Sequence, residues 1–375
     1  SLLGDFGADV IKVELPGTGD PVRAMAPSKA GVSLTWAVLS RNKRSVTLDI
    51  RKPDGRELLL RLLAASDILF ENFRPGTLDR YGLDLGTLRE ANPGIIVVRV
   101  SGYGQTGPAR DKAGFGTPAT AFSGLTYMTG FEDRSPVNQP FPLADYVTGV
   151  FSALAAVMAL YYRDTGGGIG QEVDLALYES LFRLLETVVP AYDQLGVVAQ
   201  RRGNGLSVAS PVGTYGTRDG KWAVLTASTD RTFARLTEVM ERPDLLADPR
   251  FATNELRVRH NAVLDDEMAS WFARYDRDDV IAMLDAAGVP VAPIQSIADI
   301  FDDEHFRARG NLISIDHPVL GRVTMPGVVP RLSATPGAVR HAGAHDLGAY
   351  NREVYGRLLG MSDEEIDRLQ AEGEI

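Results

Sequence analysis

The sequence predicts an α/β protein with a parallel sheet in its first half. Two observations predict this fold class. Short apolar runs bounded by turn residues alternate with helical patterns, which is typical of strand–helix–strand units. The run IIVVRV at residues 95–100 is continuous and apolar, as expected of a parallel strand buried on both faces. A chain of 375 residues is too long to fold around one simple hydrophobic core, so we expect two domains.

The first elements follow directly from these patterns. Residues 53–67 open on a proline suited to a first helical turn, and their leucines at 58, 59, 62 and 63 share one face. Residues 1–7 resemble the end of a helix and run straight into a strand, so we expect an N-terminal strand to be missing. We predict strands at residues 9–13, 45–50, 68–70 and 95–100.

The second half contains helices, one hairpin and one junction. Asp219-Gly220 between two short apolar runs predicts a hairpin with strands at 214–217 and 222–226. The Gly/Ser/Pro-rich residues 200–213 indicate a domain junction. Ser362 and Glu365 form a capping box for the last helix. We further expect helices at 175–189, between 231 and 285, and at 362–372, with a glycine turn and a short strand within 165–177 and a strand at 289–293.

Composition and charge restrict the classes of partner. The chain has 49 acidic and 39 basic residues, a net charge of −10, which disfavours nucleic acid and anionic membranes. A small polyanion in a local basic pocket remains compatible with this charge. The absence of cysteine excludes disulfides, thiol nucleophiles and thiolate metal sites, and fits a cytoplasmic protein.

The segment GYGQTG at residues 102–107 matches a dinucleotide-binding fingerprint in letters only. That fingerprint needs a helix starting within the glycines, whose N-terminal amides meet the pyrophosphate. The next residues, Pro108 to Gly114, are poor helix formers. The segment therefore disfavours a nicotinamide or flavin site.

Basic residues in the first half have two interpretations. They are Arg41, Lys43, Arg44, Arg74, Arg80, Arg110 and Lys112. Composition alone favours solvated loop charge, but each cluster lies beside a predicted strand end, where open α/β sheets bind ligands. Of the five histidines, His341 and His345 have helical spacing, but Pro336, Gly337 and Gly343 indicate a loop there. No G-x-S-x-G elbow is present. We therefore expect no metal site and no serine triad.

Asp145 stands before seventeen uncharged residues, which end at Arg163. The run contains Thr148 and Ser152 and is short of the ~20 apolar residues that span a bilayer, so we predict a buried core helix. Asp145 is then either an N-cap or a functional carboxylate. At a helix N-terminus the positive end of the dipole would lower its pKa, and an ionised, mostly dry carboxylate can attack an activated carbonyl.

Several stretches in combination resemble family III CoA-transferases, the group that contains formyl-CoA transferase and L-carnitine CoA-transferase. The stretches are GADVIKVE (7–14), RNKRSVTLDI (41–50), ENFRPGTLDRYGL (71–83), VSGYGQTGPARD (100–111), AFSGLTYMTG (121–130), ADYVTG (144–149), GQEVDLALYE (170–179) and APIQSIADI (292–300). The resemblance covers essentially the whole chain.

The resemblance implies a catalytic role for Asp145. It implies CoA contacts for Asn72, Phe73 and Arg80, and places Phe115 near the thioester. It implies transfer of CoA from an acyl-CoA to a carboxylic acid through an aspartyl mixed anhydride and an aspartyl-CoA thioester. CoA is then a substrate, with no permanently bound cofactor.

The resemblance also implies a fold and an assembly. A Rossmann-like large domain would comprise residues 1–195 and 301–375, and a smaller α+β domain residues 196–300. Two subunits would interlock as linked rings in a homodimer.

Some features depart from the family or leave alternatives open. Leu15 replaces a basic residue of some members, and residues 203–211 only approximate the glycine loop of formyl-CoA transferase, which puts formate and oxalate in doubt. The run VDLALYESLFRLLE at residues 173–186 resembles members that use succinyl-CoA and a dicarboxylic acid, for which Arg201 or Arg202 could supply a cation. α-Methylacyl-CoA racemase shares the fold, but its catalytic histidine aligns with Phe115, which cannot accept a proton. An inactive subunit of a heteromeric transferase is a third alternative, which Asp145 argues against.

Overall fold

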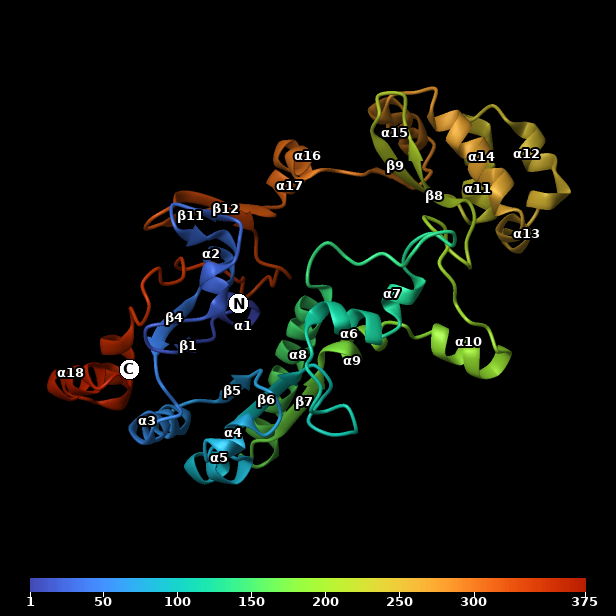
Figure 1. Cartoon of the computed structure of the whole chain (residues 1–375). Helices are drawn as coiled ribbons and strands as arrows, with labels where there is room; N and C mark the ends of the chain where they lie inside the picture. The colour runs from blue at the N-terminus through green and yellow to red at the C-terminus, as the bar shows by residue number, and fades with distance from the viewer. The chain divides into compact units, whose positions relative to one another are not determined.

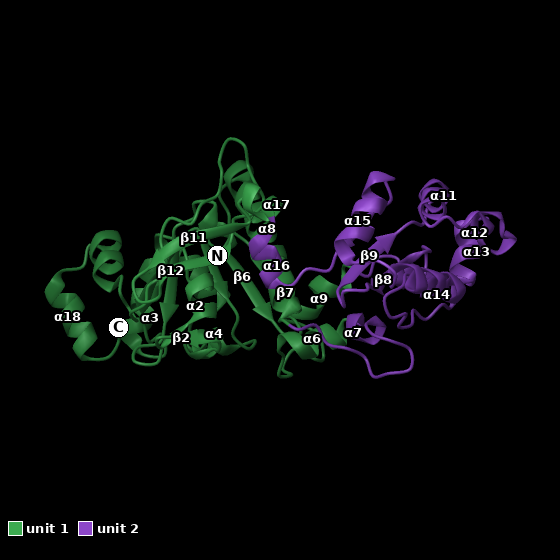
Figure 2. Cartoon of the chain, turned by 90° about the horizontal axis from the view of Figure 1, so that it is seen from above, with its two compact units in different colours: residues 1–123, 141–184, 304–375 green, residues 124–140, 185–303 purple.

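A computed structural model describes residues 1–375 as a mixed α/β chain of two compact units. Unit 1 comprises residues 1–123, 141–184 and 304–375, and unit 2 comprises residues 124–140 and 185–303 (Figure 2). Residues 124–140 and 185–195 therefore both belong to unit 2. The predicted α/β class is confirmed by the parallel strands and intervening helices of unit 1.

The elements of unit 1 carry the labels of Figure 1. They are α1 (Leu2–Asp5), β1 (Val10–Glu14), η1 (Pro21–Ala24), β2 (Ser28–Lys29), β3 (Val32–Ser33), α2 (Leu34–Leu39), β4 (Lys43–Thr47), α3 (Pro53–Ala64), β5 (Ile68–Glu71), α4 (Thr77–Arg80), α5 (Leu85–Ala91), β6 (Ile96–Ser101), α6 (Gly116–Phe122), α8 (Leu143–Gly166), β7 (Glu172–Ala176), α9 (Leu177–Phe182), α17 (Glu304–Ala308), β11 (Leu312–His317), β12 (Gly321–Pro326), the π-helical η3 (Arg352–Leu358) and α18 (Asp363–Ala371).

The elements of unit 2 are mostly helices. They are α7 (Leu125–Met128), α10 (Val188–Leu195), β8 (Val212–Gly216), β9 (Trp222–Thr226), α11 (Asp230–Val239), α12 (Pro243–Ala247), η2 (Pro249–Phe251), α13 (Asn254–Arg259), α14 (Asn261–Phe272), α15 (Arg277–Ala286), β10 (Val291–Pro293) and α16 (Ile297–Asp302).

The parallel strands of unit 1 form two sheets, where the sequence suggested one. β1 pairs with β4, and β5, β6 and β7 form a second sheet with β6 in the centre. Ile96 and Val98 of β6 face the alanines of α8, whereas Ile95 and Val97 pack toward the leucine face of α3. All four are fully buried, so the continuous apolar run reflects a strand covered by helices on both faces.

The C-terminal segment completes the core of unit 1. The Tyr355 hydroxyl donates to the Thr47 carbonyl at 2.7 Å, and Asn351 accepts from the Thr47 amide at 2.9 Å. Ile366 and Leu369 of α18 join the same apolar cluster as Leu58 of α3. The end of the chain therefore folds back on its beginning.

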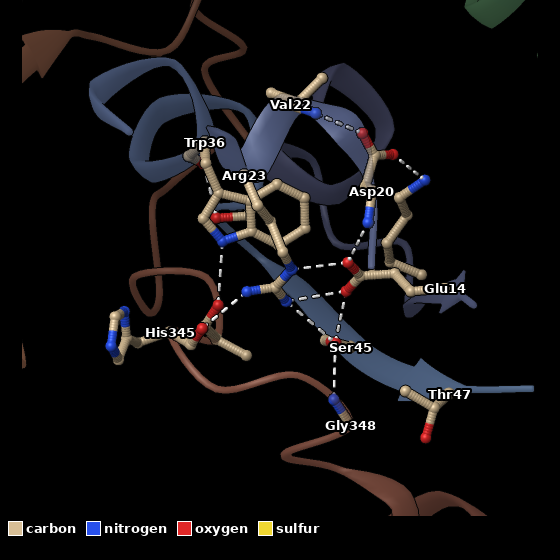
Figure 3. A network of polar contacts seen from close by, with 12 residues as sticks. Glu14, Asp20, Val22, Arg23, Trp36, Ser45, Thr47, His345 and Gly348 are labelled. Atoms are coloured by element: carbon tan, nitrogen blue, oxygen red, sulfur yellow. Dashed lines mark hydrogen bonds and ion pairs between the residues drawn. The ribbon is translucent and has the colours of Figure 1, made fainter. Parts of the chain in front are cut away.

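A buried ion pair ties β1 to the segments around it (Figure 3). Arg23 donates to both carboxylate oxygens of Glu14, at 2.6 and 2.8 Å, and to the His345 carbonyl at 2.6 Å. Ser45 and the Asp20 amide also donate to Glu14. Burial alone would raise the pKa of Glu14, but these hydrogen bonds hold the pKa below its usual range. The network thus fixes η1, β4 and the C-terminal loop around one charged carboxylate.

Unit 2 has an antiparallel sheet with the order β10-β9-β8 and its own core of helices α11 to α15. The hairpin is confirmed, since β8 pairs with β9 and Gly220 adopts a left-handed φ of 74°. Arg257 is buried in this unit and donates to the carbonyls of Ser210, Phe251 and Ser228.

Two predicted helices differ in the structure. The single helix expected at 175–189 is wrong, because α9 ends at Phe182 and α10 begins only at Val188. The short strand expected before it is confirmed as β7, which pairs with β6. The helix after Asp145 is present as α8, but only one face is buried, where a buried core helix was expected. By length and composition α8 could span a membrane, although 33% of its apolar window is buried in the protein.

Candidate active site

The glycines of GYGQTG shape a loop at the carboxyl end of β6. A β-carbon on Gly102 would lie 2.6 Å from the Gly114 Cα, so the two backbones touch where the loop leaves the strand and returns. Gly104 and Gly107 have φ values of 86° and 83°, which glycine adopts without strain. No helix begins between Gly102 and Gly116, so the segment lacks the helix N-terminus that a dinucleotide fingerprint places within its glycines.

The returning chain brings α6 against the start of α8. An ideal β-carbon on Gly116, the first residue of α6, would lie 1.8 Å from Asp145 Oδ2. The Asp145 carboxylate therefore packs directly on the Gly116 Cα. Thr148 of α8 donates to the Leu177 carbonyl at 3.3 Å, which holds the same end of α8 at the start of α9. Asp145 thus lies near the carboxyl ends of β6 and β7, where parallel sheets bind ligands.

Asp145 is not an N-cap. The helix begins at Leu143 after Pro142, and Asp145, within its first turn, makes no side-chain capping bond. Its carboxylate has no ion pair and no hydrogen bond with another residue. The residue is exposed overall, but the crowding on its Gly116 side partly desolvates the carboxylate and raises its pKa. We expected the helix dipole to lower this pKa, and that expectation is wrong because desolvation is the larger effect.

The three residues expected to contact CoA lie together after β5. Asn72 and Phe73 follow the last strand residue, Glu71, and Arg80 ends the short helix α4. All three are exposed, and Arg80 donates to the Thr77 hydroxyl at 3.0 Å. Their loop and the loop after β6 leave the same end of one parallel sheet, because β5 and β6 are neighbours.

Glu71 holds the Asn72–Phe73 turn in place. Its Oε2 accepts from the Phe73 amide at 2.7 Å, and its Oε1 lies 3.6 Å from Arg99 of β6. Burial raises the pKa of Glu71, only partly offset by the Phe73 amide and Arg99. The sequence did not predict the contact between Glu71 and Arg99, because no local pattern marks these two charged strand residues as partners.

Phe115 precedes α6 and is 77% exposed. The neighbouring aromatic residues pack on each other instead: Phe122 lies edge-on to Tyr103 and Tyr178, with ring centroids 5.1 and 5.0 Å apart. This cluster fixes the loop after β6 against α6 and α9. Phe115 is left free to contact a ligand beside Asp145.

The basic clusters divide into structural and available residues. Arg41 pairs with the buried Asp5 at 2.7 Å, and Arg44 pairs with Asp9 and Glu353, so these two are neither solvated loop charge nor free for phosphate. The residues Arg74, Arg110 and Lys112 are exposed.

The two arginines considered for an acceptor acid lie in unit 2. Arg201 donates to the carbonyls of Tyr127 and Phe131 at 2.9 and 3.2 Å, which fastens residues 127–131 to residues 200–203. Arg202 is exposed. No group of three or more potential metal ligands occurs in the structure.

Comparison with known proteins decides the family. The profile described as CoA-transferase family III matches residues 1–349. The chain belongs to CoA-transferase family III. Our predictions of the family and of CoA-transferase activity are thereby confirmed.

Relatives and solved structures agree with this membership. The chain is 45% identical to the succinyl-CoA–D-citramalate CoA-transferase of Chloroflexus aurantiacus, over 99% of this chain and 92% of the relative. It is 32% identical to the mouse succinyl-CoA:glutarate CoA-transferase, over 100% and 85% of the two chains. A CAIB/BAIF family protein from Brucella suis superposes with a TM-score of 0.83 at 33% identity, over 95% and 93% of the chains.

The position of Asp145 in this family III member predicts how its removal affects stability. A carboxyl whose pKa is raised by folding destabilises the fold when ionised, and the effect shrinks as the pH falls and vanishes well below its ordinary pKa of 3.8, where it is protonated in both states. We therefore expect Asp145→Ala to melt at the wild-type temperature or above at pH 7, with any gain shrinking as the pH falls toward 4.

A matched control is Asp84→Ala, because Asp84 caps α5 by accepting from the Gly86 and Thr87 amides. Loss of such a cap costs about 1 kcal/mol, so this variant should melt lower. Thermal denaturation followed by circular dichroism measures both. An equal loss of stability in the two variants would contradict our view that Asp145 is not a cap.

Proposed function

We propose that this enzyme transfers CoA from succinyl-CoA to a small dicarboxylic acid, with Asp145 as the nucleophile. The observation that carries the proposal is a carboxylate without an ion pair or capping bond, near the carboxyl end of a parallel sheet. The substrate class follows from relatives whose names specify succinyl-CoA with D-citramalate, L-malate or glutarate.

The proposed reaction conserves the thioester in four steps. The Asp145 carboxylate attacks the succinyl-CoA carbonyl, the C–S bond breaks, and a mixed anhydride and CoA thiolate form. The thiolate attacks the aspartyl carbonyl and releases succinate. The acceptor carboxylate attacks the resulting aspartyl-CoA thioester and expels the thiolate. The thiolate then takes the acceptor acyl group, and Asp145 is regenerated as a carboxylate.

The surroundings of Asp145 suit this chemistry. No cation neutralises the carboxylate, so its electrons remain available, and its raised pKa makes it more basic than a free aspartate. Each step develops an oxyanion, which backbone N–H groups stabilise well when they are fixed in place. Gly114 and Gly116 offer amides that carry no side chain of their own. The proposal requires neither a metal ion nor a resident cofactor.

We propose that unit 1 is a Rossmann-like CoA-binding domain, with Asn72, Phe73 and Arg80 as contacts for CoA. Their loop follows β5, and the Glu71 carboxylate fixes its backbone by accepting from the Phe73 amide, while the three side chains stay exposed. Phe115, next to Gly116, would contact the thioester end. We expect the protein to act in the cytoplasm.

We also propose that two copies form an interlocked homodimer. One face of α8 exposes large apolar side chains at a spacing of three and four residues, and α10 has no buried residue at all. These side chains are Tyr146, Val150, Leu154, Val157, Met158, Tyr161 and Tyr162 of α8, and Val189, Tyr192 and Leu195 of α10. Exposed apolar stripes of this kind mark interaction surfaces.

Light scattering of the protein without detergent tests the assembly. We expect the mass of two chains, because a second copy would cover the apolar face of α8. The mass of one chain would contradict the homodimer and favour a different partner subunit, as in relatives named as alpha and beta subunits.

The nucleophile is tested by Asp145→Asn. This change keeps the shape of the side chain but replaces a carboxylate with an amide, a far poorer nucleophile. We expect turnover to fall by at least about 10³-fold with unchanged CoA binding. Wild-type enzyme given succinyl-CoA without acceptor should form adducts that hydroxylamine captures at Asp145, located by mass spectrometry.

The wild-type enzyme also tests the alternative that the protein is a racemase. Incubation of a chiral 2-methylacyl-CoA in deuterated water should leave the α-position unexchanged. Full turnover by Asp145→Asn, or rapid deuterium incorporation by the wild type, would end the transferase mechanism proposed here.

The CoA contacts are tested by Arg80→Ala. A charge-assisted Arg–phosphate bond contributes roughly 1.5–3 kcal/mol, so CoA affinity measured by calorimetry should fall about tenfold or more. Arg89→Ala is a suitable control, since Arg89 is an exposed residue of the neighbouring helix α5. Unchanged CoA affinity in Arg80→Ala would remove this residue from the site.

A further inference from the structure

We propose that Gly116 is a positioning residue for Asp145, because the absence of a side chain at 116 creates the place that the carboxylate occupies. The inference rests on the proposed role of Asp145 as nucleophile. It adds a second residue on which that role depends, located on a different helix and separated from Asp145 in the sequence.

The geometry singles out the carboxylate as the only close neighbour. The three heavy atoms nearest to an ideal Gly116 β-carbon are Asp145 Oδ2 at 1.8 Å, Cγ at 3.0 Å and Oδ1 at 3.5 Å. Real β-carbons essentially never approach another atom within 3.0 Å. Any other residue at 116 would therefore displace the Asp145 carboxylate.

Other crowded glycines of unit 1 differ in kind. A β-carbon on Gly55 would meet the Asp49 carbonyl oxygen at 2.1 Å, and one on Gly170 the Ile95 carbonyl oxygen at 2.0 Å. Those neighbours are backbone atoms of the core, so substitution there would disturb the fold. At Gly116 the neighbour is the end of one short side chain, which can rotate.

The backbone gives no other reason for glycine at this position. Gly116 has no left-handed φ and is the first residue of α6. Alanine adopts helical backbone angles at a lower entropic cost than glycine. Glycine at 116 is therefore disfavoured by local propensity, and the space beside Asp145 accounts for it.

A substitution at residue 116 is therefore expected to lower catalysis without lowering the stability of the fold. Asp145 is exposed on its other side, so its carboxylate can turn toward solvent when a β-carbon is added at 116. The fold would persist, but the nucleophile would leave its position. A misplacement of about 1 Å costs about 100-fold in rate.

Gly116→Ala tests the inference in the full-length chain. We expect a melting temperature equal to or above that of the wild type, unchanged CoA affinity by calorimetry, and an unchanged KM for succinyl-CoA. We expect kcat to fall about 100-fold, and hydroxylamine capture at Asp145 to slow in proportion. Gly116→Ser, with a similarly placed β-carbon, should behave in the same way.

The matched control is Gly356→Ala. Gly356 also lies in a helix, and its nearest neighbour would be 3.7 Å from an added β-carbon. This variant should keep the wild-type kcat and capture rate.

Each outcome addresses one claim. Wild-type kcat and capture in Gly116→Ala would overturn the positioning role while leaving the nucleophile intact. A large fall in melting temperature would also overturn it, because the crowding would then involve more than the carboxylate. Full turnover by Asp145→Asn would instead defeat the proposed function itself.

Discussion

The contact between the backbones of Gly102 and Gly114 is the constraint on which the site depends. A chain leaving the carboxyl end of β6 must return to that end before α6 can pack against α8. The return is possible only where neither residue has a β-carbon, since the added atom would lie about 2.5 Å from the opposing Cα. This contact between the two glycines determines where the returning chain lies. It leaves Phe115 exposed, brings Gly116 to Asp145, and allows Tyr103 to pack on Phe122.

Electrostatics distinguish Asp145 from the structural carboxylates of unit 1. Glu14 and Asp5 are buried and each is paired with an arginine, which compensates the cost of removing a charge from water. Asp145 has no such partner, and its partial desolvation is left uncompensated. The lack of any ion pair or capping bond at Asp145 supports the proposal that this carboxylate reacts. The structure thus separates charges that hold the unit together from a charge that is available to react.

Helix α8 combines two roles along its length. Its small side chains, such as Ala156 and Ala159, pack closely on Ile96 and Val98 of β6, which fixes the helix and hence its first turn. Its large side chains point away from that sheet and remain exposed in the single chain. Assembly through this face would therefore act on the same rigid helix that carries Asp145. A partner that covered α8 would also reduce solvent access along it.

The sequence by itself determined the elements whose residues carry a local period or a turn signal. The apolar run of β6, the leucine face of α3 and the Asp219-Gly220 hairpin were predictable because neighbouring residues decide them. The segment after GYGQTG also argued against a dinucleotide fingerprint, since Pro108 and Gly114 interrupt any helical pattern there. Asp145 stood out as the last charge before an apolar helix.

Only the tertiary structure decided what depends on residues distant in the chain. The single helix expected at 175–189 is divided into α9 and α10, and Arg41 and Arg44 were paired by carboxylates from other segments. The raised pKa of Asp145 and the need for glycine at 116 have the same origin: both arise where two helices meet, and no local pattern records how closely they approach.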